Sequence, residues 1–137
     1  MLANRSIPPS TVIPVLAYSD MPAAVTWLCD AFGFVERLRI GDHRTQLEVG
    51  TGALVVVQRE GSAPSVQDGS VMIRVDDAHA HCARATRHGA RIVLPPTDYP
   101  FGERQYSADD PEGHRWTFSQ SVADVDPATW GGVMSRS

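Results

Sequence analysis

One stretch near the C-terminus decides the fold: the chain reads DPEGHRWTFS from Asp110 to Ser119. Its aspartate, proline and glycine predict a tight turn in which the Asp110 side chain bonds the backbone of the turn itself. The run after the turn alternates between aromatic and polar residues. The aromatic phase is Trp116 and Phe118, and the polar phase is Arg115, Thr117 and Ser119. Because successive side chains of a strand point to opposite faces, we expect the aromatic phase to pack on a helix and the polar phase to face a cavity.

The elements before this strand complete a βαβββ unit. Residues 70–75 predict a strand, Asp76 or Asp77 offers a helix N-cap, and Gly89 offers a helix stop. Further strands are expected at 90–94 and 103–108, with Pro95-Pro96 ending the first of them. The last strand of the unit is expected at 114–119.

The first half of the chain predicts the same unit. A strand at 12–18 is followed by an N-cap at Asp20, a helix and a stop at Gly33, and strands are expected at 34–40, 43–49 and 53–58. One apolar stripe of the helix, at helical spacing, is formed by Val25, Leu28, Cys29 and Phe32. A shift of 56 residues superimposes Asp20 on Asp76 and Gly33 on Gly89, which indicates an internal duplication of structure.

These patterns predict an α+β fold, in which two tandem βαβββ modules form a curled mixed sheet around a cavity. The domain is expected to be single, spanning 1–137, since compact domains usually have about 100 to 150 residues. Within it, module one covers 11–59, a Gly/Ser/Pro-rich linker 60–69, module two 70–120 and a C-terminal tail 121–137.

Charge and composition restrict the partners. The net charge of −4 argues against a nucleic-acid partner, which favours a basic face. No apolar run approaches the roughly 20 residues of a membrane span, and no basic segment with an apolar core follows the N-terminus, so no membrane partner is expected. The two cysteines, Cys29 and Cys82, are separated and read as buried thiols of a reducing compartment. We therefore expect a cytoplasmic protein.

Several motifs in this order resemble the vicinal oxygen chelate superfamily, which includes glyoxalase I, extradiol dioxygenases and bleomycin-resistance proteins. They are residues 20–33, Val75-Asp76-Asp77, Gly89-Ala90, Pro95 to Asp98 with Phe101-Gly102, and residues 110–114. The resemblance covers residues 12–120 and is nearest to small glyoxalase-like or bleomycin-resistance-like proteins. It implies a homodimer, because two-module folds of this family usually pair or exchange modules.

Enzymes of this family hold a divalent metal with His, Gln or Glu side chains from four strands. The resemblance places those positions here at Ile13, Val56, Ser70 and Thr117. A shift of one residue in the apolar run 54–57 would only exchange one valine for another. None of the four side chains is a usual ligand of a catalytic divalent metal, so we expect no metal and no other cofactor.

Other candidate residues favour structural roles. Glu48 is expected on the solvent-facing phase of its strand, and His81 and His88 on the surface of the second helix. No motif predicts a nucleophile or a phosphate loop, and no catalytic residue is assigned. Trp130 is expected to anchor the tail against the body of the protein or against a partner subunit.

The sequence therefore predicts a protein that binds or sequesters a small organic molecule. The strand phases place seven residues around the ligand: Ile13, Val56, Ser70, Met72, Tyr106, Arg115 and Thr117. The alternative is a metal-dependent glyoxalase-like lyase or isomerase with displaced ligands, and a protein with no ligand at all is a third possibility.

Overall fold

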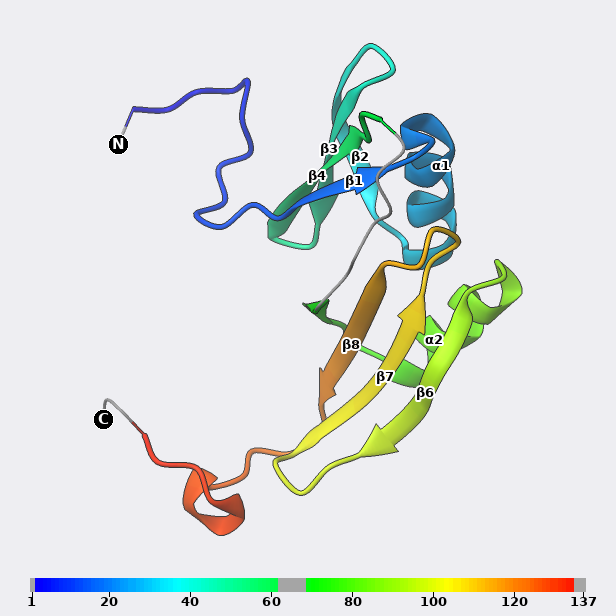
Figure 1. Cartoon of the computed structure of the whole chain (residues 1–137). Coiled ribbons are helices and arrows are strands. Elements are labelled where there is room, and N and C mark those ends of the chain that lie inside the picture. Colours follow the sequence, from blue (N-terminus) through cyan, green and yellow to red (C-terminus); the bar gives the residue numbers. More distant parts are fainter. Residues whose placement is uncertain (1, 62–68, 135–137) are drawn as a thin grey trace. The chain divides into compact units, whose positions relative to one another are not determined.

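A computed structural model describes residues 2–61 and 69–134, and the chain divides into two units, Met1–Gln67 and Asp68–Ser137. Each unit contains one four-stranded mixed sheet with one helix packed on it (Figure 1). The α+β class and the two βαβββ modules are thus confirmed. Most of the predicted linker 60–69 lies outside the described residues. That the sheets curl around a shared cavity stays a prediction.

Unit 1 has five regular elements, whose sheet order is β1-β4-β3-β2 with β1 parallel to β4 and the other pairs antiparallel. They are β1 (Val15–Tyr18), α1 (Met21–Phe32), β2 (Val35–Ile40), β3 (Arg44–Val49) and β4 (Gly52–Gln58). The predicted caps of α1 are present. The Asp20 carboxylate accepts a hydrogen bond from the Ala23 backbone N–H at 3.1 Å, and Gly33 ends the helix with a φ of 79°.

Unit 2 repeats this topology, with sheet order β5-β8-β7-β6 and β5 parallel to β8. Its elements are β5 (Ser70–Arg74), α2 (Ala78–Arg87), β6 (Arg91–Asp98), β7 (Glu103–Asp109), β8 (Arg115–Ser121) and a short 3₁₀ helix, η1 (Pro127–Trp130). Of the two candidate caps of α2, Asp77 is used, and its carboxylate accepts from the Ala80 N–H at 3.0 Å. Gly89 follows the helix with a φ of 84°.

The strand β6 is longer than predicted, because it continues through Pro95 and Pro96 to Asp98. Proline cannot donate a ladder hydrogen bond, but β6 is the edge of its sheet, where a missing donor is tolerated. Its pairing with β7 is irregular between Leu94 and Thr97, the segment that holds both prolines. The proline pair therefore disturbs the register without ending the strand.

Each unit contains an equivalent hydrogen bond between a glutamine side chain and the start of its helix, which the sequence did not predict. In unit 1 the Gln58 side chain, at the end of β4, accepts from the Met21 N–H of α1 at 2.9 Å. In unit 2 the Gln120 side chain on β8 accepts from the Ala78 N–H of α2 at 2.8 Å. The first N–H groups of a helix have no partner within the helix. In both units a glutamine from a central strand therefore fixes the helix start to the sheet.

Each sheet has one face against its helix and one face turned away from it, which we call the open face. In unit 1 the helix-side face includes Thr45, whose hydroxyl lies 3.1 Å from the sulfur of Met21 in α1. In unit 2 it includes Phe118, whose ring lies 4.2 Å from the His81 ring of α2. Trp116 and Phe118 are fully buried, as the alternation in β8 predicted. No helix within the described ranges is long and apolar enough to cross a membrane.

Candidate functional site

The open face of unit 2 carries the even-numbered residues of β5 and the odd-numbered residues of β7 and β8. The strand register places them side by side, because paired residues of neighbouring strands point to the same face. Ser70 pairs with Arg115 and Met72 pairs with Thr117. Four of the seven predicted ligand residues therefore lie together on one face of one sheet.

Tyr106 lies on the opposite face, so the predicted phase of β7 is wrong. It pairs with Phe118, is fully buried, and hydrogen-bonds through its hydroxyl to Nδ1 of His81 in α2. Burial raises the pKa of the Tyr106 phenol. The prediction that His81 lies on the helix surface is also wrong, because its ring contacts Tyr106. His88 is exposed, as predicted. Tyr106 and His81 belong to the packing between α2 and its sheet.

Val56 also lies on the helix side of its sheet. It pairs with Thr45, the residue that contacts Met21 of α1, and is fully buried. Its neighbour Val55 pairs with Gln46 on the open face of unit 1. Ile13 is half-buried and precedes β1 by two residues. The predicted register in β4 was therefore displaced by one residue.

A chain of polar contacts crosses the open face of unit 2 around Ser119. The Gln105 amide donates to the Ser119 hydroxyl at 3.0 Å, and that hydroxyl donates to the Glu103 carboxylate at 2.7 Å. Beside it, the Arg74 guanidinium donates to the Ser121 hydroxyl at 2.8 Å. Ser119 was predicted on the polar phase that faces a cavity, whereas its partners Glu103 and Gln105 and the neighbouring Arg74 were not predicted.

These side chains border a hollow of about 230 Å³, lined by Met72, Arg74, Glu103 and Ser119. Met72 is 61% exposed, so an apolar surface lies directly beside the polar groups. Hydrogen bonds from Ser121 and Ser119, together with the charge of Arg74, lower the pKa of Glu103 below its ordinary value of 4.5. The carboxylate is therefore ionised at neutral pH and presents an acceptor beside the Arg74 donor.

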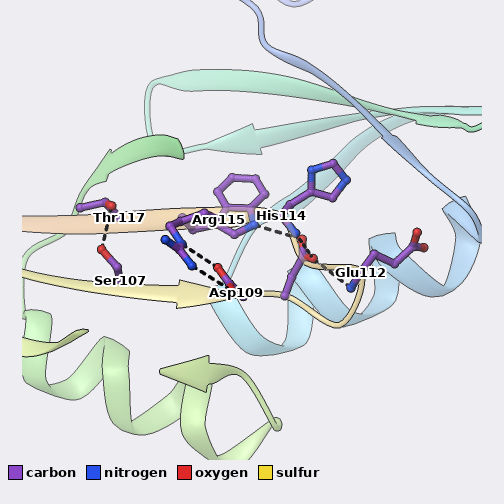
Figure 2. A network of polar contacts seen from close by, with 8 residues as sticks. Ser107, Asp109, Glu112, His114, Arg115 and Thr117 are labelled. Carbon is purple, nitrogen blue, oxygen red and sulfur yellow. Dashed lines mark hydrogen bonds and ion pairs between the residues drawn. The ribbon is translucent and has the colours of Figure 1, made fainter. Parts of the chain in front are cut away.

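A second group of contacts lies further along the same face (Figure 2). Arg115 forms two hydrogen bonds to the Asp109 carboxylate, at 2.9 and 3.1 Å, and the hydroxyls of Ser107 and Thr117 lie 2.9 Å apart. Thr117 is thus bonded across the strands, and Arg115 is held by a neighbouring acid. Both predicted residues are on the face, but their polar atoms already have partners.

The turn before β8, in which Figure 2 labels Glu112 and His114, is built around Asp110, as predicted. Its carboxylate accepts from the backbone N–H groups of Glu112 and His114 at 3.1 and 3.0 Å, and from the Trp116 indole N–H at 3.1 Å. Asp110 is 5% exposed, and this triple acceptance satisfies the carboxylate inside the protein. The turn therefore fixes Trp116 inward and sets the phase in which Thr117 points to the open face.

The resemblance assigns the family's metal ligands to four positions, whose side chains have the following chemistry. Ile13 and the β4 valines have hydrocarbon side chains, while Ser70 and Thr117 contribute only hydroxyls. Glu48 is exposed in unit 1, as predicted. Residues 2–61 and 69–134 contain no group of three or more His, Cys, Asp or Glu side chains placed to hold a metal ion. The side chains at these positions do not fit a divalent cation.

Residues 11–118 match the model of the glyoxalase/bleomycin resistance protein/dioxygenase superfamily. The chain belongs to this superfamily. The match covers both βαβββ units and the turn at Asp110, which confirms the resemblance inferred from the motifs. No curated protein sequence matches the chain.

Three solved structures are similar to this chain. TioX from Micromonospora sp. ML1 is 38% identical, with a TM-score of 0.70, over 82% of this chain and 99% of that one. Lactoylglutathione lyase from Agrobacterium tumefaciens is 18% identical, with a TM-score of 0.65, over 92% and 100% of the two chains. The fosfomycin resistance protein FosX from Mesorhizobium loti is 16% identical, with a TM-score of 0.64, over 83% and 93%. The latter two share the fold with this chain.

Proposed function

We propose that this superfamily member binds or sequesters a small organic molecule through the open face of unit 2, without a metal ion. The observation that carries the proposal is the side-chain chemistry of that face. A carboxylate and a guanidinium, Glu103 and Arg74, border the hollow beside the exposed thioether of Met72. This combination suits hydrogen bonding and stacking, and it lacks the imidazole and carboxylate cluster that metal-assisted chemistry requires.

The bonding capacity of these residues restricts the ligand. Glu103 accepts hydrogen bonds from Ser119 and Ser121 and, as an ionised carboxylate with about four lone-pair sites, has room for a ligand donor. Arg74 uses one of its N–H groups on Ser121 and retains others for a ligand acceptor. A ligand with a donor and an acceptor on one edge and an aromatic ring over Met72 would satisfy all three side chains.

The size of the hollow supports recognition of part of a ligand. Its volume of about 230 Å³ is below the range of roughly 300 to 1,000 Å³ for pockets that bury a drug-sized molecule. We therefore expect unit 2 to hold one end of the ligand, such as a planar heteroaromatic amide.

A thermal-shift screen tests this proposal, with planar heteroaromatic amides compared with aliphatic amides of similar size. At least one aromatic amide should raise the melting temperature, and its affinity should fall at least tenfold in Glu103→Gln and Arg74→Met. Glu48→Gln is the matched control, because it removes an exposed carboxylate from unit 1. The proposal is wrong if no organic compound stabilises the protein while Mn²⁺, Ni²⁺ or Zn²⁺ does.

The alternative, a metal-dependent lyase or isomerase with displaced ligands, has only family membership in its support. It requires about one metal ion per subunit in protein purified without chelator. Elemental analysis that finds a stoichiometric metal would favour it over the binding protein.

We also propose that the protein is a cytoplasmic homodimer. Cys29 and Cys82 are both free thiols, which suits a reducing compartment. The edge strands β1 and β5 each expose an apolar side chain, Val15 and Met72, at 54% and 61%. Exposed apolar groups on sheet edges favour association. Light scattering should give twice the monomer mass, and a monomer would contradict the proposal.

A further inference from the structure

The open face of unit 1 is covered by the chain's own N-terminal residues, which we call the N-terminal segment (residues 4–8). The amide nitrogen of Gln46 on β3 donates to the Ser6 carbonyl oxygen at 2.8 Å. The Arg37 guanidinium on β2 donates to the Arg5 carbonyl oxygen at 3.0 Å. Two side chains of the sheet therefore bind two successive main-chain carbonyls.

The segment has a defined shape where it is bound. The Asn4 side chain accepts from the Ser6 N–H at 3.0 Å, and the Ile7 N–H donates to the Asn4 carbonyl at 3.3 Å. These contacts form a turn that presents the carbonyls of Arg5 and Ser6 to the sheet. Pro8, directly after the turn, is buried. The bound segment thus supplies two acceptors followed by one apolar side chain.

The two side chains that bind the segment, Arg37 and Gln46, are also hydrogen-bonded to each other. Arg37 is the extra residue of the bulge between Glu36 and Leu38, and it donates to the Gln46 side-chain oxygen as well. That bond orients the Gln46 amide so that its nitrogen points to the segment. Bulges redirect a side chain in this way.

Gln46 is only 2% exposed, so its amide N–H group depends on an acceptor within the protein. The segment supplies the acceptor for this buried amide N–H. Arg37 and Gln46 both donate to backbone carbonyl oxygens of the segment. The site therefore recognises a peptide backbone and not a particular residue at positions 5 and 6.

We propose that the open face of unit 1 is a binding site for a turn of peptide backbone, occupied in the resting protein by residues 5–8 of the same chain. Its ligand class is a peptide that presents two successive carbonyl oxygens to Arg37 and Gln46, followed after one residue by a small apolar side chain. Backbone hydrogen bonds supply the affinity in this mode of recognition, and the apolar position supplies the specificity. An external peptide competes with the bound segment.

A synthetic peptide of residues 2–10 with a fluorescent label tests the site in the full-length protein. The variant Pro8→Asp places a charge on a buried position and should release the segment. Released protein should bind the peptide with a saturable anisotropy change, and wild type should bind it at least tenfold more weakly, because its own segment occupies the site. Adding Gln46→Leu to Pro8→Asp should reduce peptide binding at least tenfold, whereas adding Glu48→Gln on the same strand should not.

Two further measurements show whether the variant is folded and whether the segment has been released. Circular dichroism and thermal melting establish that Pro8→Asp is folded, and a second full-length variant with residues 5–8 replaced by Gly-Ser-Gly-Ser serves if it is not. In ¹⁵N-labelled protein the Gln46 side-chain amide resonances should shift when the segment is released and return when the peptide is added. The proposal is overturned if folded, released protein does not bind the peptide, or if wild type binds it equally well.

Discussion

In unit 1 the open face carries Gln46 at 2% exposure beneath the chain's own residues, whereas in unit 2 the corresponding face carries Met72 at 61% exposure beside a hollow. The two faces belong to sheets of the same topology. The difference lies in the side chains that face away from the helices and in what covers them. One duplicated scaffold therefore provides a face covered by the chain's own residues in unit 1 and the face that we propose to bind a ligand in unit 2.

The helix sides of the two units differ in a complementary way. The helix α1 buries bulky side chains of its own, among them Met21, Leu28 and Phe32, whereas α2 buries only Ala78 and Ala85. In unit 2 the large buried groups come from the strands instead, as Tyr106, Trp116 and Phe118. In unit 1 both the helix and the strands supply large buried side chains, the latter including Leu47 and Leu54, whereas in unit 2 they come from the sheet.

The largest expected effect is a difference in the free energy of unfolding between substitutions on the two faces of β8. Trp116→Ala should lower the free energy of unfolding by about 3 to 5 kcal/mol, because it empties a fully buried indole site and removes a donor to Asp110. Thr117→Ala, one residue away on the open face, should cost about 1 kcal/mol through the Ser107 contact. Urea unfolding measures both. Equal losses would mean that the two faces of β8 are not distinguished by burial.

A smaller difference in the free energy of unfolding is expected between substitutions of the two glutamines that bond the helix starts. Gln120→Ala should cost about 1 kcal/mol, because it removes one hydrogen bond to α2. Gln58→Ala should cost about 2 kcal/mol, since its side chain bonds both Met21 N and the Ser19 carbonyl. Chemical denaturation with each variant measures the difference, and a greater loss from Gln120→Ala would reverse the expected order.

The smallest effect concerns pH and the Glu103 carboxylate. Because the folded protein lowers the pKa of Glu103 below 4.5, its contribution to stability is complete above that pH. That contribution should disappear as the pH falls through the folded pKa. The difference in melting temperature between wild type and Glu103→Gln should therefore shrink from pH 6 to pH 3. Ser121→Ala, which removes the main cause of the shift, should weaken this dependence, and an unchanged profile would count against the contact.

Much of the framework was predictable from local signals. Asp20, Gly33 and Asp110 act through their own neighbouring backbone, so their roles can be read from residues a few positions apart. The phase of β8 was also predictable, because Trp116 and Phe118 alternate with Arg115 and Thr117. The αβ pattern of both units follows from such local patterns.

The remaining features depend on information that the sequence pattern lacks. The run from Leu54 to Val57 is apolar at every position, so no alternation indicates which valines face α1. Tyr106 has both an apolar ring and a polar hydroxyl and suits either face, and its position was decided by His81 in a distant helix. The contacts of Gln46 and Arg37 with residues 5 and 6 join segments more than 30 positions apart and have no local signal.

Nuclear magnetic resonance mapping of the aromatic amide ligand on ¹⁵N-labelled wild-type protein tests the central claim most directly. Without added metal, the ligand should shift the Gln105 side-chain amide and the backbone amides of Met72, Arg74 and Ser119. The Gln46 side-chain amide, on the self-occupied face of unit 1, should stay unchanged. Shifts confined to unit 1, or shifts in unit 2 that require Zn²⁺, would contradict the account.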